Sequence, residues 1–324
     1  MHREHTWALL LAAGDGERLR PLTTTASGTA IPKQFCSLQG GPSLLHEALC
    51  RARALTSKVR TCAIVAEPHR RWWERQLWSL PVENRIVQPK NCGTANGILL
   101  PLLQILERDP RARIVLMPTD HYVSEETVLA RSMRQGMDQL RWRSDEVVLL
   151  GFEPEDADPQ LGYIVPGTTG CGTSLRTIER FVEKPSASEA RDLIEGGAMW
   201  NAFIVMASAQ ALLELFRHRV PEVVARMHAA LQSNPRSTAG EKALAALYDR
   251  LPVIDFSRDV LQGQEPFLRV LPVPRCGWSD LGTPERVMDV LRRAPQRAPE
   301  RGDDEWHVAT DCLSLAVQQH LQSA

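Results

Sequence analysis

Short apolar runs rich in valine, isoleucine and leucine alternate along the chain with longer segments whose apolar residues recur at helical spacing. The runs predict strands at Trp7–Ala13, Arg60–Ala66, Arg113–Met117, Glu146–Phe152, Leu175–Phe181, Asn201–Ala207 and Phe267–Leu271. The longer segments predict helices at Ser43–Leu55, Pro68–Leu80, Thr94–Arg108, Ser124–Arg141, Ser186–Glu195 and Ala209–Arg219, and a helical pair between 221 and 250. Strands separated by helices of this length are typical of βαβ units, so the pattern predicts an α/β fold with a mostly parallel sheet.

The end of the chain differs in composition from the rest. The stretch "APQRAPERGDD", from Ala294 to Asp304, is rich in proline and charge and is typical of a linker. We therefore expect one domain over residues 1–293, and a linker with a short helical tail over residues 294–324. A chain of 324 residues is long enough for such a domain to bury a full-sized core.

The net charge of the chain bears on which classes of partner are expected. The net charge is −1 and the pI about 6.8, which gives no electrostatic reason to expect nucleic acid or a membrane as a partner. No apolar run approaches the roughly 20 residues that span a bilayer. The seven cysteines contain no CxxC spacing, which favours reduced thiols and a cytoplasmic location over disulfides or a zinc site.

Candidate chemistry begins in the loop "LAAGDGERLRPLT", which continues to "PKQF" and should lie at the carboxyl edge of the sheet, where open sheets bind ligands. Gly14 and Gly16 let backbone N–H groups approach an anion. Arg18 and Lys33 add two cations, which suit a polyphosphate. Leu19 replaces the third glycine of a dinucleotide fingerprint, and the Gly-Lys-Ser/Thr of a Walker A motif does not follow. For the glycine pair alone, a plain strand-to-helix turn with solvated arginines is the alternative.

The order of residues in this loop resembles the signature of the sugar-phosphate nucleotidyltransferases, and "PKQF" is most similar to that of the mannose-1-phosphate guanylyltransferases. The resemblance implies a Rossmann-like nucleotidyltransferase fold, with a mixed, mostly parallel sheet flanked by helices and residues 1–293 as the catalytic domain. It also implies that a nucleoside triphosphate lies on the loop, at Leu11, Ala12, Ala13, Gly14 and Gly16. Arg18 would then hold the departing pyrophosphate, and Lys33 would lie on the phosphates at the reacting centre.

The stretch "VQPKNCGTANG" resembles the family's Q-P-x-N-x-G-T-A segment, which lies near the base. On that resemblance Gln88, Gly93 and Thr94 join the nucleotide site. The amide of Gln88 can donate and accept hydrogen bonds, and Thr94 can cap the following helix, which is also its alternative role. Two positions depart from the family: Glu17 replaces the usual threonine of the glycine loop, and Cys92 replaces a frequent arginine. Either change could weaken nucleotide affinity.

Two aspartates are candidate metal ligands. "VLMPTDHYV" ends a predicted strand with Asp120, "CGWSDLGTPERV" places Asp280 before a helix, and both stretches resemble the family's magnesium-binding motifs. A lone aspartate after a strand could instead cap a turn, and we interpret His121 as structural. Mg²⁺ takes one or two protein carboxylates together with phosphate oxygens, so the pair is chemically sufficient. Without nucleotide, two nearby carboxylates should repel one another.

Three further stretches, "LGYIVPG", "FVEKP" and "MWNAFIVMA", resemble the sugar-binding elements of the family. The resemblance assigns Gly162, Glu183 and Asn201 to the sugar and Lys184 to the sugar's phosphate. A carboxylate suits sugar hydroxyls and an ammonium suits a phosphate, although an exposed Glu-Lys pair before proline is also common on surfaces. Phe203 stands where the family has glycine, which puts the backbone contacts of that turn in question.

The resemblance implies transfer of a guanylyl group from GTP to mannose 1-phosphate, giving GDP-mannose and pyrophosphate, with Mg²⁺ as cofactor. Two alternatives stay open: another nucleoside triphosphate or hexose 1-phosphate, such as glucose 1-phosphate, and an inactive regulatory subunit that binds sugar nucleotides. The expected partners are GTP and a sugar 1-phosphate, and a homodimer is left open. About forty residues follow the last motif, too few for the extension of bifunctional relatives, so the resemblance is to a short form without isomerase activity.

Overall fold

The computed structural model describes residues 4–25, 27–38, 40–170, 172–232 and 237–293. Its strands are β1 (Thr6–Leu11), β2 (Thr61–Ala66), β3 (Arg85–Gln88), β4 (Arg113–Pro118), β5 (Tyr122–Val123), β6 (Val147–Phe152), β7 (Gly162–Thr169), β8 (Arg176–Glu183), β9 (Met199–Ser208), β10 (Leu268–Val273) and β11 (Trp278–Ser279). Its α-helices are α1 (Arg20–Thr23), α2 (Leu44–Arg53), α3 (Arg70–Gln76), α4 (Thr94–Arg108), α5 (Glu126–Gln139), α6 (Ala187–Glu195), α7 (Ala209–Arg219), α8 (Pro221–Ala230), α9 (Thr238–Tyr248) and α10 (Pro284–Arg293). The linker and tail expected over residues 294–324 lie outside the described residues.

A large central sheet has the strand order β3-β2-β1-β4-β9-β6-β10-β8-β7. Parallel pairing joins β3, β2, β1 and β4, and also β6 with β10. β9 connects the two halves by antiparallel pairing to β4 and β6, and β7 and β8 form an antiparallel pair at the far edge. The predicted α/β fold with a mixed sheet flanked by helices is confirmed, but the sheet is not mostly parallel: four of its described strand pairs are parallel and five are antiparallel. Its parallel pairing is concentrated in the first half of the chain, where helical crossovers connect the strands.

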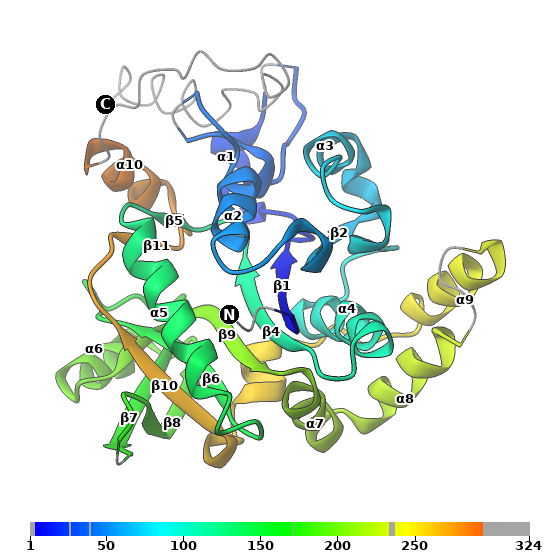
Figure 1. The fold of residues 1–324 in the computed structure, drawn as a ribbon. Coiled ribbons are helices and arrows are strands. Elements are labelled where there is room, and N and C mark those ends of the chain that lie inside the picture. Colours follow the sequence, from blue (N-terminus) through cyan, green and yellow to red (C-terminus); the bar gives the residue numbers. More distant parts are fainter. Residues whose placement is uncertain (1–3, 26, 39, 171, 233–236, 294–324) are drawn as a thin grey trace.

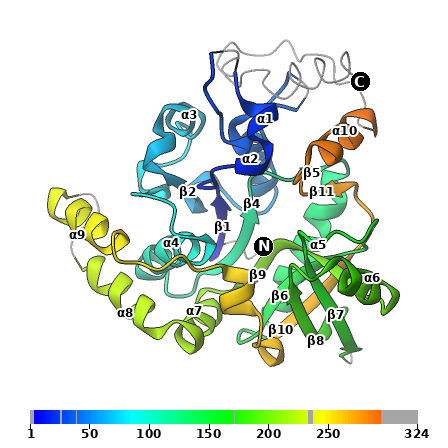
Figure 2. The same ribbon diagram turned by 180° about the vertical axis from the view of Figure 1, so that it is seen from behind.

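The central strand β1 is buried on both faces, which explains why its sequence is apolar from Trp7 onward rather than alternating. Ala8 and Leu10 belong to the core that includes α2 and α5, whereas Trp7 and Leu9 belong to the core that includes α4 and α7. Figures 1 and 2 show these two helical layers on opposite sides of the sheet. With both faces covered, the carboxyl edge of the parallel strands is where their loops reach solvent.

The predicted elements recur with small shifts. Each predicted strand overlaps an observed strand, α4 and α7 begin and end at the predicted residues, and α8 and α9 form the expected helical pair. α5 begins at Glu126 rather than Ser124, because the Ser124 hydroxyl donates a hydrogen bond to the carbonyl of Cys276 instead of capping the helix. The pattern does not predict β3, β5, β7 or β11.

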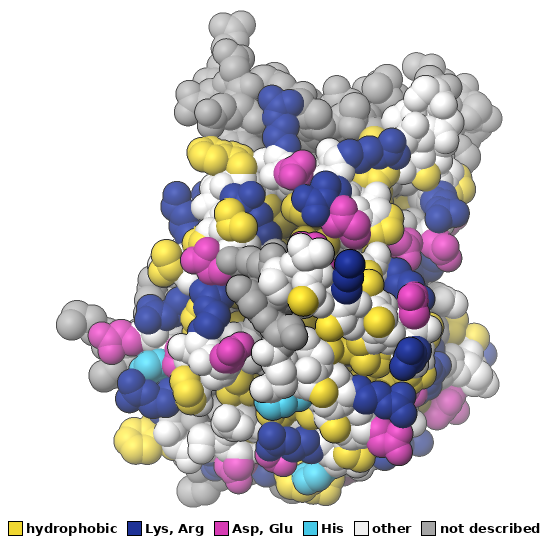
Figure 3. All heavy atoms as spheres, turned by 90° about the vertical axis from the view of Figure 1, so that its right-hand side faces the viewer, with side chains coloured by type: hydrophobic (Ala, Val, Ile, Leu, Met, Phe, Trp, Pro, Cys, Tyr) yellow, Lys and Arg dark blue, Asp and Glu magenta, His cyan; other side chains and the backbone are white. Residues whose placement is uncertain are grey.

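The surface charge, the helices and the cysteines can be compared with the partners and the location expected from the sequence. On the face shown in Figure 3, Lys and Arg side chains are interspersed with Asp and Glu side chains rather than gathered into a field of one sign. Within the described ranges, no helix combines the length and the apolar character required to cross a bilayer. Among the described cysteines, Cys36, Cys62, Cys92 and Cys276 are buried and Cys50 is exposed, and none of these five forms a disulfide.

Candidate active site

A short antiparallel ribbon brings the two candidate metal ligands together. β5 begins two residues after Asp120, and β11 ends at the residue before Asp280. Ser279 lies opposite Tyr122 in the ribbon, so Asp280 comes to lie beside the turn that carries Asp120. That turn follows β4, which pairs in parallel with β1, and it therefore lies at the edge where the glycine loop begins. Two segments far apart in the sequence thus meet beside the proposed triphosphate loop.

Lys33 joins the two aspartate segments. It is 4% exposed, and its ammonium nitrogen lies 3.1 Å from Oδ2 of Asp120. The same ammonium donates hydrogen bonds to the backbone carbonyls of Asp280, at 2.7 Å, and Leu281, at 3.3 Å. One carboxylate and two carbonyls therefore hold a buried cation at the centre of the site.

A cavity of about 260 Å³ opens beside Lys33. Its lining comes from the glycine loop, the end of β4 and the last motif: Gly16, Glu17, Arg18, Leu19, Lys33, Asp120, Leu281 and Gly282. The Arg18 side chain is 55% exposed, and its Nη2 lies 4.0 Å from Oδ2 of Asp280. Glu17, a departure from the family, is also largely exposed and lies 3.6 Å from Nη2 of Arg20, so a cation partly neutralises its carboxylate. Arg18 and Lys33 thus line one cavity with room for an anion.

An arginine to which the sequence motifs assign no role holds Asp280. Nη1 of Arg286 lies 2.7 Å from Oδ1 of Asp280. Its Nη2 lies 3.0 Å from Asp156 and 2.9 Å from Asp158, in the loop between β6 and β7. The guanidinium carbon also lies over the ring of Trp200, 5.1 Å from its centre. Because Arg286 lies in the first turn of α10, this helix ties the last motif to the sugar-side strands.

Cations offset the repulsion expected between the two aspartates, because Lys33 lies beside Asp120 and Arg286 beside Asp280. Burial alone would raise the pKa of Asp120, but the neighbouring charges, Lys33 foremost, lower it. Burial would likewise raise the pKa of Asp280, and the nearby cations, among them Arg286, lower it. Both carboxylates are therefore ionised at neutral pH without any nucleotide.

His121 is a neutral member of this cluster. Burial lowers its pKa to about 4, so the ring carries no charge at neutral pH. Its Nδ1 accepts a hydrogen bond of 3.2 Å from Nε1 of Trp278, and the two rings pack edge to face with centres 5.2 Å apart. These contacts link β5 to β11 and agree with a structural role for His121.

A glutamine from "PKQF" supports the glycine loop. Nε2 of Gln34 donates hydrogen bonds to the carbonyls of Ala12, at 3.0 Å, and Gly14, at 2.8 Å. Gly16 has φ of +64°, and a Cβ there would stand 2.8 Å from the backbone nitrogen of Lys33. Only glycine therefore brings this loop so close to the lysine. A Cβ at Gly14 would meet no atom within 4 Å, so this part of the loop faces open space.

The loop is continuous with the next motif. It leaves the sheet at Leu11 and passes through Ala13, which is buried. Between the two glycines, Asp15 accepts a hydrogen bond of 3.0 Å from Nδ2 of Asn91, and Nε2 of His69 lies 3.2 Å from its other oxygen. The glycine loop and the "QPKNCGTA" segment are therefore joined by side-chain contacts and border the candidate nucleotide site together.

The residues assigned to the base are placed differently from one another. Gln88 is 1% exposed, and its Oε1 accepts a hydrogen bond of 3.4 Å from the hydroxyl of Tyr248, so its amide is not open to a ligand. Gly93 is the N-cap residue of α4. The hydroxyl of Thr94 accepts a hydrogen bond of 2.8 Å from the N–H of Phe256, and so it does not cap the helix as expected.

The segment Ile254–Leu261 connects the nucleotide and sugar motifs. Ile254 exchanges two backbone hydrogen bonds with the "QPKNCGTA" segment, at 3.1 and 3.2 Å. Asp255 and Ser257 lie close enough to act on the carboxyl of Glu183: the charge of Asp255 raises its pKa, and the Ser257 hydroxyl lowers it. Neither Asp255 nor Ser257 is predicted from the sequence, because nothing local distinguishes them from the polar residues of an ordinary turn.

Three strands bring the candidate sugar residues side by side. Gly162 on β7 pairs with Glu183 on β8 and with Asn201 on β9, so it lies between the two. A Cβ at Gly162 would stand 2.6 Å from Oε2 of Glu183 and 3.4 Å from the Cβ of Asn201. Glycine here leaves the space that the carboxyl of Glu183 fills.

The pKa of Glu183 lies near neutral pH. Burial, followed by the charge of Asp255, raises its pKa to about 7, and the ammonium of Lys184, 3.7 Å away, opposes that rise. The Lys184 side chain is 54% exposed. In the part of the chain that the structure describes, no hydrogen bond or ion pair joins Lys184 to the cluster around Lys33. The structure therefore groups Lys184 with the sugar residues and leaves it apart from the aspartates.

A sequence model of the nucleotidyl transferase family matches residues 7–297. This chain belongs to the nucleotidyl transferase family. The match includes the glycine loop, both aspartate turns, the sugar-side strands and α10, so every cluster described above falls inside the family region.

Other nucleotidyl transferases and related proteins resemble this chain over most of its length. The xanthan biosynthesis protein XanB of Xanthomonas campestris is 26% identical over 305 residues, which cover 91% of this chain and 61% of XanB. The mannose-1-phosphate guanylyltransferase RfbM of Salmonella typhimurium is 25% identical over 319 residues, with 94% and 62% covered. The chain thus spans about three fifths of the length of these curated relatives. A crystal structure titled mannose-1-phosphate geranyltransferase, from Thermus thermophilus, superposes with a TM-score of 0.71 at 27% identity, covering 86% of this chain and 76% of that one.

The donor chemistry of this nucleotidyl transferase site fits a divalent cation that is shared with phosphates. Asp120 and Asp280 supply ionised carboxylate oxygens, the ligands that Mg²⁺ takes singly or in pairs beside phosphate oxygens and waters. Among the described residues, no group of three or more His, Cys, Asp and Glu side chains is placed to hold a metal ion. A cation here would therefore depend on substrate oxygens to complete its coordination.

Proposed function

We propose that this chain transfers a nucleotidyl group from a nucleoside triphosphate to a sugar 1-phosphate and releases pyrophosphate. The observation that carries the proposal is the convergence of Arg18, Lys33 and Asp120 on one cavity, with Asp280 beside it, at the edge where the glycine loop leaves β1. Transfer of this kind needs positioned cations and charge neutralisation more than a covalent protein group.

The positions of the side chains suggest a division of roles. Arg18, exposed to the cavity, would neutralise the leaving pyrophosphate, and the buried Lys33 would neutralise the phosphate at the reacting centre. Mg²⁺ held by the two aspartates would supply Lewis-acid chemistry at the phosphates. The sugar would lie against Glu183 and Asn201 with its phosphate toward Lys184, and one oxygen of that phosphate would attack the α-phosphorus in line.

We infer that GTP and mannose 1-phosphate are the favoured pair, with GDP-mannose as the product. The inference is supported by the resemblance of "PKQF" and by relatives that are named mannose-1-phosphate guanylyltransferase, at about 25% identity. Another nucleoside triphosphate or hexose 1-phosphate is the alternative at this level of identity. An inactive binding subunit is disfavoured, because it would have no need for Arg18, Lys33 and both aspartates together.

We also propose that the chain works in the cytoplasm. The described cysteines form no disulfide and most of them are buried, and reducing compartments keep cysteines in the thiol state. Fractionation of cells that express the tagged chain tests this location; recovery in an oxidising compartment with disulfides formed would contradict it.

The test of the function is pyrophosphate release by the purified chain, with four nucleoside triphosphates crossed with several hexose 1-phosphates, with and without Mg²⁺. The highest kcat/KM is expected for GTP with mannose 1-phosphate. A higher value for dTTP or UTP with glucose 1-phosphate would replace the substrate pair while leaving the reaction class. Calorimetric binding of a sugar nucleotide with no pyrophosphate from any pair would instead support the regulatory subunit.

A further inference from the structure

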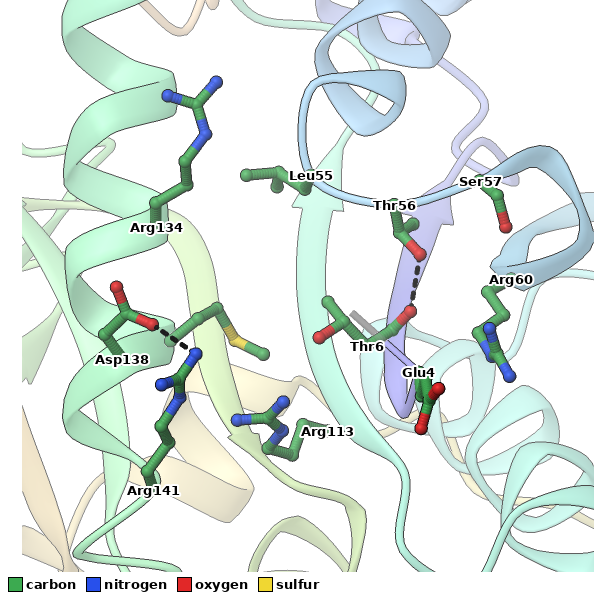
Figure 4. A pocket seen from close by; sticks show the side chains of 11 residues that line it. Glu4, Thr6, Leu55, Thr56, Ser57, Arg60, Arg113, Arg134, Asp138 and Arg141 are labelled. Atoms are coloured by element: carbon green, nitrogen blue, oxygen red, sulfur yellow. Dashed lines mark hydrogen bonds and ion pairs between the residues drawn. The ribbon is translucent and has the colours of Figure 1, made fainter. Parts of the chain in front are cut away.

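A second pocket lies at the opposite edge of the sheet from the candidate active site. It has a volume of about 680 Å³ and is lined by residues from the start of β1, the segment after α2, the start of β4 and the end of α5 (Figure 4). Thr6 begins β1, and the glycine loop follows the other end of this six-residue strand. A strand rises about 3.3 Å per residue, so the two pockets are separated by roughly 20 Å of sheet.

Arginines dominate the charge of this second pocket. Four of them line it from three segments, namely Arg60, Arg113, and Arg134 with Arg141 at α5, against the two carboxylates of Glu4 and Asp138. Asp138 is already paired with Arg141 at 3.1 Å. Within the described ranges, Arg60 and Arg134 have no ion-pair partner. The pocket therefore carries more positive charge than its own acids neutralise.

The arginines also act on one another. In Figure 4 the guanidinium groups of Arg113 and Arg141 approach each other across the lower part of the pocket. Burial, and then the charge of Arg141, lowers the pKa of Arg113, and Asp138 only partly opposes that effect. An anion that entered between them would relieve this repulsion.

The remaining lining gives the pocket room and donors for more than a single ion. The Ser57 hydroxyl adds a hydrogen-bond donor, and Leu55 and Met137 add apolar surface. Planar guanidinium groups bind phosphate oxygens in a bidentate manner, which makes arginine the preferred residue for such groups. A volume of this size lies in the range of small-molecule sites.

We propose that this pocket is a second ligand site, separate from the candidate active site, which binds a small molecule through a diphosphate group. Free pyrophosphate and the diphosphate of a nucleotide share this chemistry. Arg134 and Arg60 stand on opposite sides of the pocket, and the apolar surface of Leu55 between them suits the uncharged part of a nucleotide.

Isothermal titration calorimetry on the whole chain, with pyrophosphate and with GDP as separate probes, tests the proposal. Wild-type protein is expected to bind two equivalents of probe. Arg134→Glu is expected to weaken one of the two binding events at least tenfold. Arg131→Glu is the matched control, because Arg131 is exposed on the same helix outside the pocket and the change in net charge is identical. Arg60→Glu, on a different element, should reproduce the loss.

Two outcomes would overturn the second site. These are equal effects of Arg134→Glu and Arg131→Glu on every binding event, or binding that is undiminished in both pocket variants with unchanged melting temperature. A single equivalent that Arg134→Glu weakens would instead place the probe in this pocket alone. Tighter binding of GDP than of pyrophosphate would identify the nucleotide as the source of the diphosphate, and the reverse would identify the free anion. Since the readout is binding, it is independent of whether the chain turns over any sugar phosphate.

Discussion

Replacement of Glu183 by glutamine should stabilise the protein at alkaline pH while it removes a group of the proposed sugar site. The Glu183 side chain is 12% exposed and fills the space left by Gly162. Burial and the charge of Asp255 disfavour its ionised form and raise its pKa to about 7, from an ordinary value of 4.5. Ionisation of the Glu183 carboxyl therefore lowers the free energy of unfolding.

The sign and size of that cost follow from proton linkage. Below pH 4.5 the carboxyl is protonated in the folded and unfolded states alike, and it leaves stability unaffected. As the pH rises from 4.5 to 7, the unfolded state releases the proton while the folded state keeps it, so the free energy of unfolding falls. Each pH unit of difference corresponds to 1.36 kcal/mol, and the cost therefore reaches about 3 kcal/mol above pH 7.

Urea unfolding at several pH values between 5 and 8.5 measures this effect. Glu183→Gln cannot ionise, so its free energy of unfolding should be close to that of the wild type at pH 5 and higher by about 2–3 kcal/mol at pH 8.5. Glu179→Gln, at an exposed position of the same strand, should follow the wild type at every pH. If Glu183→Gln is no more stable than the wild type at pH 8.5, Lys184 stabilises the carboxylate more than burial destabilises it, and the reasoning fails.

Three further substitutions separate the roles of the site. Lys33→Met removes the cation between the two aspartates and should slow turnover at least a hundredfold, which corresponds to about 3 kcal/mol. Lys58→Met, at an exposed position, should leave turnover unchanged. Equal rates in the two variants would refute the assignment. Arg286→Lys loses the guanidinium that joins three carboxylates, and it should lower the free energy of unfolding in urea by about 1–2 kcal/mol. Arg293→Lys, in an exposed ion pair, should lower it by less than about 0.5 kcal/mol. Lys184→Asn suits the φ of +50° and should leave the melting temperature unchanged while it raises KM for the sugar phosphate; a melting temperature lower by several degrees would contradict this.

The fold could be predicted wherever the pattern of the sequence is local. Long amphipathic helices such as α4 and strands buried on both faces such as β1 carry their signal within one segment. β3 is a four-residue edge strand, and β7 contains Pro166 and two threonines, so neither forms an apolar run. The two-residue strands β5 and β11 are too short for any periodicity, although they bring the aspartates together.

The residues of the candidate site also divide into those that a local pattern predicts and those that it does not. The motif residues Arg18, Lys33 and Asp120 follow from the resemblance, and the structure gathers them around one cavity. Gln34 and Arg286 could not be assigned, because their roles depend on contacts between segments that only the tertiary fold brings together. Both residues stand inside quoted motifs, so the only signal was their nearness in sequence to residues already assigned.

Phe203 lies inside β9, where the register with β6 shifts, and this local turn of the backbone shows how a departure from the family pattern is tolerated. The residue keeps φ of +57°, the left-handed conformation that suits glycine, and its N–H donates a hydrogen bond of 3.2 Å to Oδ1 of Asn201. The ring packs edge to face against Phe256, with centres 5.8 Å apart. Contacts on both sides of the residue therefore offset the strain, and the turn that orients Asn201 survives the loss of glycine.

Strain of this kind recurs at the site. Among the described residues, those other than glycine with positive φ are Lys184, Phe203 and Leu281. Each lies one or two residues after a side chain assigned to the sugar or the metal, and each belongs to a different segment. A left-handed conformation costs a non-glycine residue about 1 kcal/mol and persists only where its surroundings hold it. Three separate segments thus accept a strained turn directly beyond the residue they present, which is expected where the direction of a side chain matters more than the stability of its turn.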